Sequence, residues 1–180
     1  MATLKIVRIG HPALRKKSTP VTKKELMTPK FQKFLDDLAA ICIKNKGAGI
    51  AAPQVNVNKR VIVVHVDPKN PRYPGRPAFP LTIVINPRVT KRSQQIQEDW
   101  EGDLSSNLRA MVPRARTATV VGIDRTGKQV KFNLAKPFHA RIFQHEIDHL
   151  DGRFLLDKVK RKETITELAE WKRYWKDKKG

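Results

Sequence analysis

The segment from Pro137 to Leu150 constrains the fold of this 180-residue chain more than any other. Proline is favoured at the first position of a helix and Gly152 follows as a stop, so the sequence predicts a helix here. This helix contains His145 and His149. A spacing of four residues places both imidazoles on one helix face, where they can bind one cation. The helix is therefore predicted to carry the chemistry.

Glu146, beside the first histidine, adds an acid/base group to this pattern. Its carboxylate can take a proton from a water whose pKa a bound cation lowers toward about 7. The same five-residue pattern also occurs by chance in helices whose two histidines are ordinary surface or core residues. A hydrolytic metal site needs a third protein ligand, so the position of that ligand decides which class of hydrolase the chain fits.

The third ligand has candidates on both sides of the helix. Downstream, Leu155 stands where the extended protease pattern HExxHxxGxxH requires a histidine, which disfavours that class. Glu167 and its neighbours Glu163 and Glu170 could supply a carboxylate, as in another class of zinc endopeptidase. They lie in a strongly charged predicted helix, so we expect them to face solvent. Upstream, residues 101–105 (EGDLS) offer a different candidate.

The rest of the chain predicts short strands flanked by helices. A helix begins after Thr28, with Pro29 at its first position, and ends near Asn45 before Gly47. Runs rich in Val and Ile predict strands at 60–66, 81–89, 117–124 and 128–134, and the last two form an antiparallel hairpin. Strands and helices that do not alternate regularly indicate an α+β fold.

The C-terminal segment is basic and amphipathic. A third helix is predicted beyond Asp157, with Ile165, Leu168, Trp171 and Trp175 roughly on one face. Such a helix packs on its own domain by default, although it could also dock elsewhere. The net charge of +20 attracts polyanions such as ribosomal RNA, and it also fits a solubilising surface.

The apolar runs and the cysteine content of the sequence bear on solubility and on disulfide formation. We expect a soluble chain, because no apolar run approaches the roughly 18 residues that span a bilayer and no signal peptide is apparent. The single cysteine, Cys42, permits no internal disulfide and lies on a predicted apolar helix face. It is expected to be a core residue.

Three segments, in order, resemble the peptide deformylase family: residues 47–54 (GAGIAAPQ), 101–105 (EGDLS) and 144–149 (QHEIDH). The start of the chain, residues 9–15 (IGHPALR), is similar to the family's N-terminus. The resemblance extends to about Lys158. The resulting expectation is an α+β fold with mixed, mainly antiparallel sheets packed around a central HExxH helix, and with a C-terminal helix.

The resemblance implies a metal-dependent hydrolase that removes the N-formyl group from the N-terminal methionine of newly made polypeptides. It implies one divalent metal ion, Fe²⁺ or Zn²⁺, bound by Asp103, His145 and His149. Glu146 would deprotonate the attacking water and later protonate the leaving amine. The implied oxyanion donors are the side-chain amide of Gln54 and the backbone N–H of Leu104. Gly49 and Gly102 would line the substrate backbone.

The chain departs from the family at two places. The third metal ligand is normally a cysteine, whereas here the position is Asp103. A carboxylate also brings one negative charge, but it is a harder ligand than a thiolate and should alter the metal preference. The next residues, 105–109 (SSNLR), lack the proline usual in the family, and this bears on substrate preference.

Two parts of the chain follow as expectations: a deformylase-like catalytic domain at 1–157 and a basic amphipathic helix at 158–180. Expected partners are the N-formylmethionyl peptide and the ribosome at its exit region, with no membrane. A monomer in the cytoplasm is expected, or in an organellar matrix if a targeting segment has been removed. Two alternatives stay open: a catalytically altered or inactive relative that binds ribosome or RNA, and a zinc endopeptidase that uses Glu167.

Overall fold

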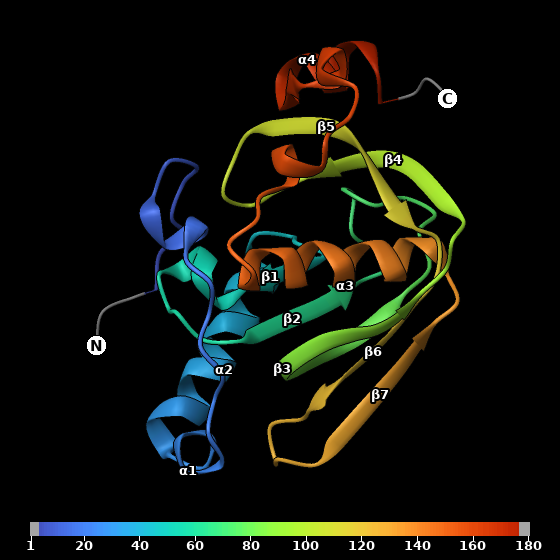
Figure 1. The fold of residues 1–180 in the computed structure, drawn as a ribbon. Coiled ribbons are helices and arrows are strands. Elements are labelled where there is room, and N and C mark those ends of the chain that lie inside the picture. The colour runs from blue at the N-terminus through green and yellow to red at the C-terminus, as the bar shows by residue number, and fades with distance from the viewer. Residues whose placement is uncertain (1–3, 177–180) are drawn as a thin grey trace.

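The computed structural model describes residues 4–176, which form two β-sheets with a helix between them (Figure 1). The helices are Lys23–Leu26 (α1), Pro29–Lys44 (α2), Pro137–Leu150 (α3) and Leu168–Tyr174 (α4). The strands are Gly49–Ala51 (β1), Val61–Val66 (β2), Phe79–Arg92 (β3), Ile96–Gly102 (β4), Leu108–Ala115 (β5), Ala118–Ile123 (β6), Gln129–Leu134 (β7) and Thr166–Glu167 (β8). Four 3-10 turns lie at Pro12–Arg15 (η1), Ala52–Val55 (η2), Leu155–Lys158 (η3) and Lys162–Thr164 (η4).

All named strands pair antiparallel, in one sheet of order β1-β2-β3-β6-β7 and a second of order β4-β5-β8. One isolated bridge, between Thr19 and Lys59, is parallel. Helix α3 contacts strands of both sheets and occupies the space between them (Figure 1). The expected α+β architecture around a central HExxH helix is therefore confirmed.

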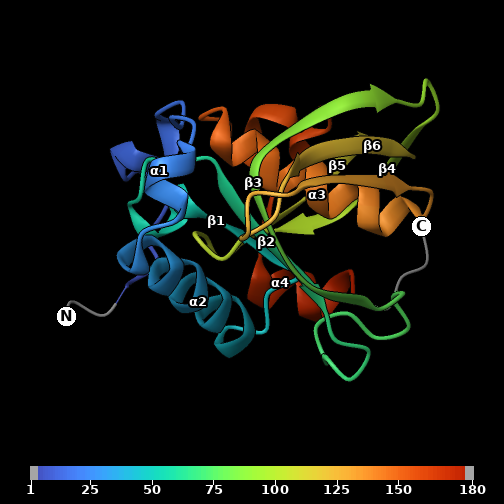
Figure 2. The same cartoon turned by 90° about the horizontal axis from the view of Figure 1, so that it is seen from below.

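Strand β2 is buried on both faces, which explains its unbroken run of branched apolar residues. Val61 and Val63 belong to the apolar cluster that contains the buried face of α2. Ile62 and Val64 belong to the cluster that contains the buried face of α3. Since side chains alternate along a strand, each helix receives every second residue. Figure 2 shows α2 beside β1 and β2, on the side of these strands away from α3.

Helix α2 begins and ends as the sequence predicts. The Thr28 hydroxyl accepts a hydrogen bond from the Phe31 N–H at 3.2 Å, and Pro29 is the first helical residue. Cys42 lies in the apolar core with no exposed surface. Burial raises the pKa of its thiol to about 12, so this cysteine is an unreactive core residue.

The hairpin of β4 and β5 is absent from the sequence prediction. Its residues pair from Ile96 with Ala115 to Gly102 with Arg109. Strand β4 has the sequence IQEDWEG, and its charged residues interrupt the apolar pattern from which a strand is predicted. Asp103 follows β4 directly, in the turn that leads to β5. The hairpin therefore carries the third ligand candidate to the face of α3.

The predicted C-terminal helix is present but much shorter than expected. It covers Leu168–Tyr174, whereas the residues between Lys158, where η3 ends, and Leu168 form one 3-10 turn, η4, and the short strand β8. The Thr164 hydroxyl accepts a hydrogen bond from the Met111 N–H at 3.1 Å, and β8 then pairs with the edge of β5. This pairing requires an extended backbone, so a continuous helix from 158 is wrong. Residues 177–180 of the prediction lie outside the described residues.

The C-terminal segment packs on the small sheet through aromatic side chains. The rings of Trp100 and Trp171 lie 6.1 Å apart, and those of Trp100 and Trp175 lie 5.8 Å apart. The guanidinium of Arg109 lies over the Trp171 ring at 5.8 Å. The default expectation of packing on its own domain is thus confirmed for the described part. Within residues 4–176 no helix has the length and apolar character needed to cross a bilayer.

Candidate metal centre

Helix α3 brings the two histidines of the HExxH pattern together on its inner face. His145 and His149 are both buried, and their ring centroids are 5.0 Å apart. The helix ends at Leu150, and Gly152 follows in the left-handed region with φ +70°. Any Cβ at that glycine would lie 2.6 Å from the Arg15 carbonyl oxygen, so glycine is required there. The predicted stop is confirmed.

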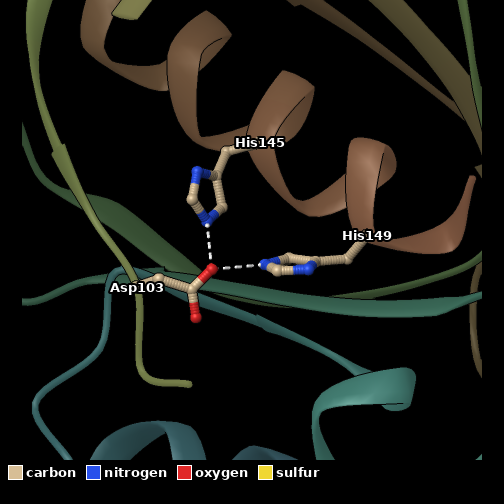
Figure 3. Close-up of side chains that lie close together, drawn as sticks. All are labelled: Asp103, His145 and His149. Carbon is tan, nitrogen blue, oxygen red and sulfur yellow. Dashed lines mark ion pairs between the residues drawn. The ribbon is translucent and has the colours of Figure 1, made fainter. Parts of the chain in front are cut away.

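Asp103 completes a group of three ligand atoms. Its Oδ2 lies 2.7 Å from Nε2 of His149 and 3.3 Å from Nε2 of His145. Figure 3 shows this oxygen between the two imidazoles. One ligand atom from each of the three residues lies within 4.8 Å of the others. The structure therefore brings together all three residues that the sequence resemblance implies as metal ligands.

The chemistry of these atoms fits a divalent cation. Among the described residues, Oδ2 of Asp103 and Nε2 of His149 are buried and lie close to each other without forming a hydrogen bond of good geometry, and Oε2 of Glu146 is buried with no hydrogen-bond partner. Buried polar atoms without partners are costly, and a bound cation would satisfy them. Two imidazoles and one carboxylate are a ligand set found in zinc hydrolases and in non-haem iron sites.

Glu101 fixes the orientation of His145. Oε2 of Glu101 lies 2.8 Å from Nδ1 of His145, which leaves Nε2 facing the ligand group. Arg114 holds Glu101 through two hydrogen bonds of 2.9 and 3.0 Å, and Arg141 adds one of 2.7 Å. Arg114 also pairs with Asp148.

The charge state of Glu101 follows from these contacts. Burial alone would raise its pKa, but the positive charge of Arg114 and the hydrogen bonds from His145 and Arg114 outweigh burial. The pKa of Glu101 therefore lies well below its ordinary value, and the group is a permanent carboxylate. An anionic partner makes a ligating imidazole more basic and fixes its tautomer, so Glu101 supports metal binding through His145.

Glu146 is buried directly against Gly49, where there is no room for a side chain. A Cβ added at Gly49 would lie 2.5 Å from Oε1 of Glu146. Burial raises the pKa of Glu146 to about 7, and the negative charges of Asp103 and Glu101 act in the same direction, opposed by the two histidines. A carboxyl group that titrates near neutral pH can both accept and donate a proton.

Gln54 and Leu104, the two implied oxyanion donors, both border the pocket beside the ligand group. Gln54 donates through Nε2 to Oδ1 of Asp103 at 2.9 Å and to the Ser105 hydroxyl at 3.3 Å. The backbone N–H of Leu104 makes no hydrogen bond within residues 4–176. The structure thus gives Gln54 a contact with Asp103 that the sequence analysis does not anticipate.

The two glycines implied as substrate contacts also border this pocket. Gly49 lies in β1 and Gly102 at the end of β4. A Cβ at Gly102 would overlap the guanidinium of Arg109, so this glycine makes room for that group. Apart from Glu101, the other lining side chains are aromatic, apolar or basic: Arg72, Tyr73, Trp100, Phe138, Arg141 and Ile142.

The rejected ligand positions lie elsewhere in the fold. Leu155 is buried in the apolar cluster of the small sheet with Ala110 and Val112. Glu167 is exposed and pairs with Leu108 on β5, and it does not belong to the ligand group found among the described residues. The endopeptidase alternative therefore has no support from the position of Glu167.

The fold and site place the chain in the class of α+β proteins that build a metal centre on an HExxH helix. The model of the polypeptide deformylase family matches residues 3–164. Peptide deformylase 2 of Nostoc sp. is 43% identical over 166 residues, which cover 91% of this chain and 90% of that protein. Peptide deformylase 1 of Bordetella pertussis is 36% identical, with 86% of each covered.

A solved structure is similar over nearly its whole length. The Met-Ala-Ser bound class I type b peptide deformylase from Acinetobacter baumannii has a TM-score of 0.83 and 34% sequence identity. The match covers 88% of this chain and 99% of that one. The chain belongs to the polypeptide deformylase family, and the expectation of an enzyme of this class is confirmed.

Proposed function

We propose that this enzyme removes the formyl group from N-formylmethionyl peptides, with one divalent cation held by Asp103, His145 and His149. The observation that carries the proposal is that the three ligand atoms lie together, and that Asp103 and His145 line one pocket with the carboxylate of Glu146. The cation, Fe²⁺ or Zn²⁺, supplies Lewis acidity to the carbonyl and lowers the pKa of water. Side chains and backbone groups of the protein carry out the proton transfers and stabilise the developing charge.

Glu146 moves the proton in both halves of the reaction. It takes a proton from water as the water oxygen bonds to the formyl carbon. The C–N bond then breaks, and Glu146 returns the proton to the leaving nitrogen. The products are formate and a peptide with a free amino terminus. The burial that raises the pKa of Glu146 to about 7 suits this two-way transfer.

The developing negative charge on the formyl oxygen needs donors other than the cation. We assign the Leu104 N–H to this role, together with the second N–H of Gln54, whose contact with the Ser105 hydroxyl is long at 3.3 Å. An oxyanion donor of this kind typically contributes about 10²- to 10³-fold in rate. Gly49 and Gly102 would leave the substrate backbone free to approach.

The proposal is tested by formate release from a formyl-Met peptide. The purified chain should release formate, lose this activity on treatment with a chelator, and regain it with Fe²⁺ or Zn²⁺. Release that persists after complete metal removal would contradict the assignment of the three ligands.

Gly49→Ala should lower kcat/KM for deformylation by about 100-fold, because misplacing a catalytic group by about 1 Å has an effect of this size. The new methyl group would lie 2.5 Å from Oε1 of Glu146, which is itself buried and cannot move freely. Steady-state kinetics with matched metal content measure the effect. Gln94→Ala, at an exposed residue in the turn between β3 and β4, is the control for a general effect of alanine. Full activity of Gly49→Ala would mean that Glu146 is held differently.

We further propose that the basic C-terminal segment assists docking at the ribosome exit, that residues 1–157 are the catalytic part, and that the chain acts as a cytoplasmic monomer. Lys172 and Arg173 are exposed on α4, and the net charge of +20 favours a polyanionic partner. Their double replacement by glutamate should weaken ribosome binding in cosedimentation without changing turnover of a free peptide. The same replacement at Lys23 and Lys24 is the control. Equal binding by both variants would contradict a role for α4.

Nothing in the described residues favours the alternative of an inactive relative that only binds RNA. The three ligands lie together, and two of them, Asp103 and His145, line the same pocket as Glu146. The basic surface is therefore interpreted as an aid to an active enzyme.

A further inference from the structure

The two carboxylate oxygens of Asp103 face different partners. Oδ2 lies between the imidazoles of His145 and His149, and Figure 3 shows the other oxygen pointing away from both rings. That other oxygen, Oδ1, accepts two hydrogen bonds, one from the Ser105 N–H at 2.6 Å and one from Gln54 Nε2 at 2.9 Å. One oxygen is thus engaged by the protein, and one is left for a cation.

The orientation of the Gln54 amide is fixed by its other end. Oε1 of Gln54 accepts a hydrogen bond from the Ala51 N–H at 2.8 Å. Because the oxygen is fixed there, the NH₂ group must face Asp103. Gln54 is 1% exposed and Asp103 is 5% exposed, so water does not compete for this contact. A hydrogen bond to a charged group is stronger than one between neutral groups.

We propose that Gln54 is a positioning residue for the metal ligand Asp103, in addition to its place beside the reacting carbonyl. Together with the Ser105 N–H, it holds Oδ1 so that Asp103 binds the cation through Oδ2 alone. The inference rests on the metal site of the proposed function, but not on the reaction performed there. It follows from the carboxylate in this chain, because a thiolate at position 103 would offer a single ligand atom and no second acceptor.

This role differs from a purely structural one. If Gln54 served only to bond Ala51 and fill space, its loss would affect folding equally whatever residue stands at position 103. If Gln54 holds the carboxylate, its loss should weaken metal binding only when Asp103 is present. A double-mutant cycle separates the two because it measures whether the effect of one residue depends on the other.

The experiment compares the natural chain, Gln54→Leu, Asp103→Cys and the double variant. The probe is Co²⁺, with its dissociation constant measured by competition with a coloured chelator and its visible absorption spectrum recorded. Gln54→Leu should weaken Co²⁺ binding about 10- to 100-fold in the Asp103 chain, the usual loss when a partner of a ligand is removed. In the Asp103→Cys chain the same change should alter binding by less than about 3-fold.

Gln54→Glu and Gln144→Leu complete the design. Gln54→Glu keeps the shape of the side chain and the acceptor for the Ala51 N–H, but it removes the donor to Asp103. It should therefore weaken Co²⁺ binding at least as much as Gln54→Leu does. It replaces Gln54→Leu in the test if that variant does not fold. Gln144 is a buried amide on α3 that donates to the carbonyls of Ala115 and Ala140, so Gln144→Leu should leave Co²⁺ affinity unchanged.

Equal losses of Co²⁺ affinity in the natural and Asp103→Cys backgrounds, or no loss in either, would overturn the proposal. Metal binding is measured without substrate, so a failure of deformylation would leave the result intact. Conversely, a negative result here would leave the proposed reaction standing.

Discussion

Glu146→Gln is expected to abolish formate release while the metal content stays the same. The amide has nearly the shape of the carboxylate but cannot accept the proton of the attacking water or return one to the leaving nitrogen. Acid/base catalysis by one positioned side chain contributes about 10²- to 10⁴-fold, and here the same residue acts in both steps. We therefore expect a loss of kcat/KM of about 10⁴-fold, near the upper end of that range.

The measurement is steady-state formate release by chains loaded with the same metal, with metal content determined on each sample. Glu163→Gln is the matched control, because Glu163 is exposed on a 3-10 turn and makes only a surface contact with Arg161. The control should retain full activity. Activity of Glu146→Gln within about 10-fold of the natural chain would remove Glu146 from the acid/base role.

Asp103→Ala is expected to release the metal and, with it, the activity. Asp103 supplies one of the three protein ligands. Removing a residue that only hydrogen-bonds to a ligand weakens metal binding about 10- to 100-fold, so the loss of Asp103 itself should weaken it further. The two imidazoles would also lose their anionic neighbour. Metal analysis after dialysis measures the first effect, and formate release measures the second.

Asp103→Cys is the informative companion to this variant. It restores a single anionic ligand atom, so it should keep the metal but bind soft cations more tightly than the natural chain does. Asp37→Ala, at an exposed carboxylate paired with Lys33, controls for loss of a negative charge. Full metal occupancy in Asp103→Ala would show that the third ligand lies elsewhere.

An element of this fold could be predicted where a single requirement, such as burial or helix capping, determines its sequence pattern. Strand β2 is apolar because both faces are buried, and α2 has a hydroxyl cap and a proline at its start. Strands β4 and β5 have no such pattern. Trp100 of β4 packs against α4, while Glu98 and Asp99 pair with arginines near the surface. Tertiary contacts therefore decided where these strands form.

The metal ligands could be predicted from the sequence, but the residues that hold them in place could not. The spacing of His145 and His149 and the resemblance at 101–105 located the ligands. The contact of Glu101 with His145 could not be predicted, because nothing in a sequence shows that β4 lies against α3. The glutamate two residues before Asp103 on a strand points to the same face, which is the signal that could have suggested it.

The C-terminal segment shows a limit of helical periodicity. Its apolar residues recur at helical spacing, yet Thr164 and Thr166 are β-branched and the edge of β5 was open to pairing. A strand that covers this edge satisfies backbone groups that a longer helix would have left exposed. Hydrogen bonding to the edge of β5 therefore outweighs the helical propensity of this segment.

The most direct test of the central claim is product analysis on a formyl-Met peptide incubated with the metal-loaded chain. We predict equal amounts of formate and of peptide that has lost only its formyl group and gained a free amine. Cleavage of an internal peptide bond, or an intact formyl-peptide at full metal occupancy, would contradict the assignment of this site to deformylation.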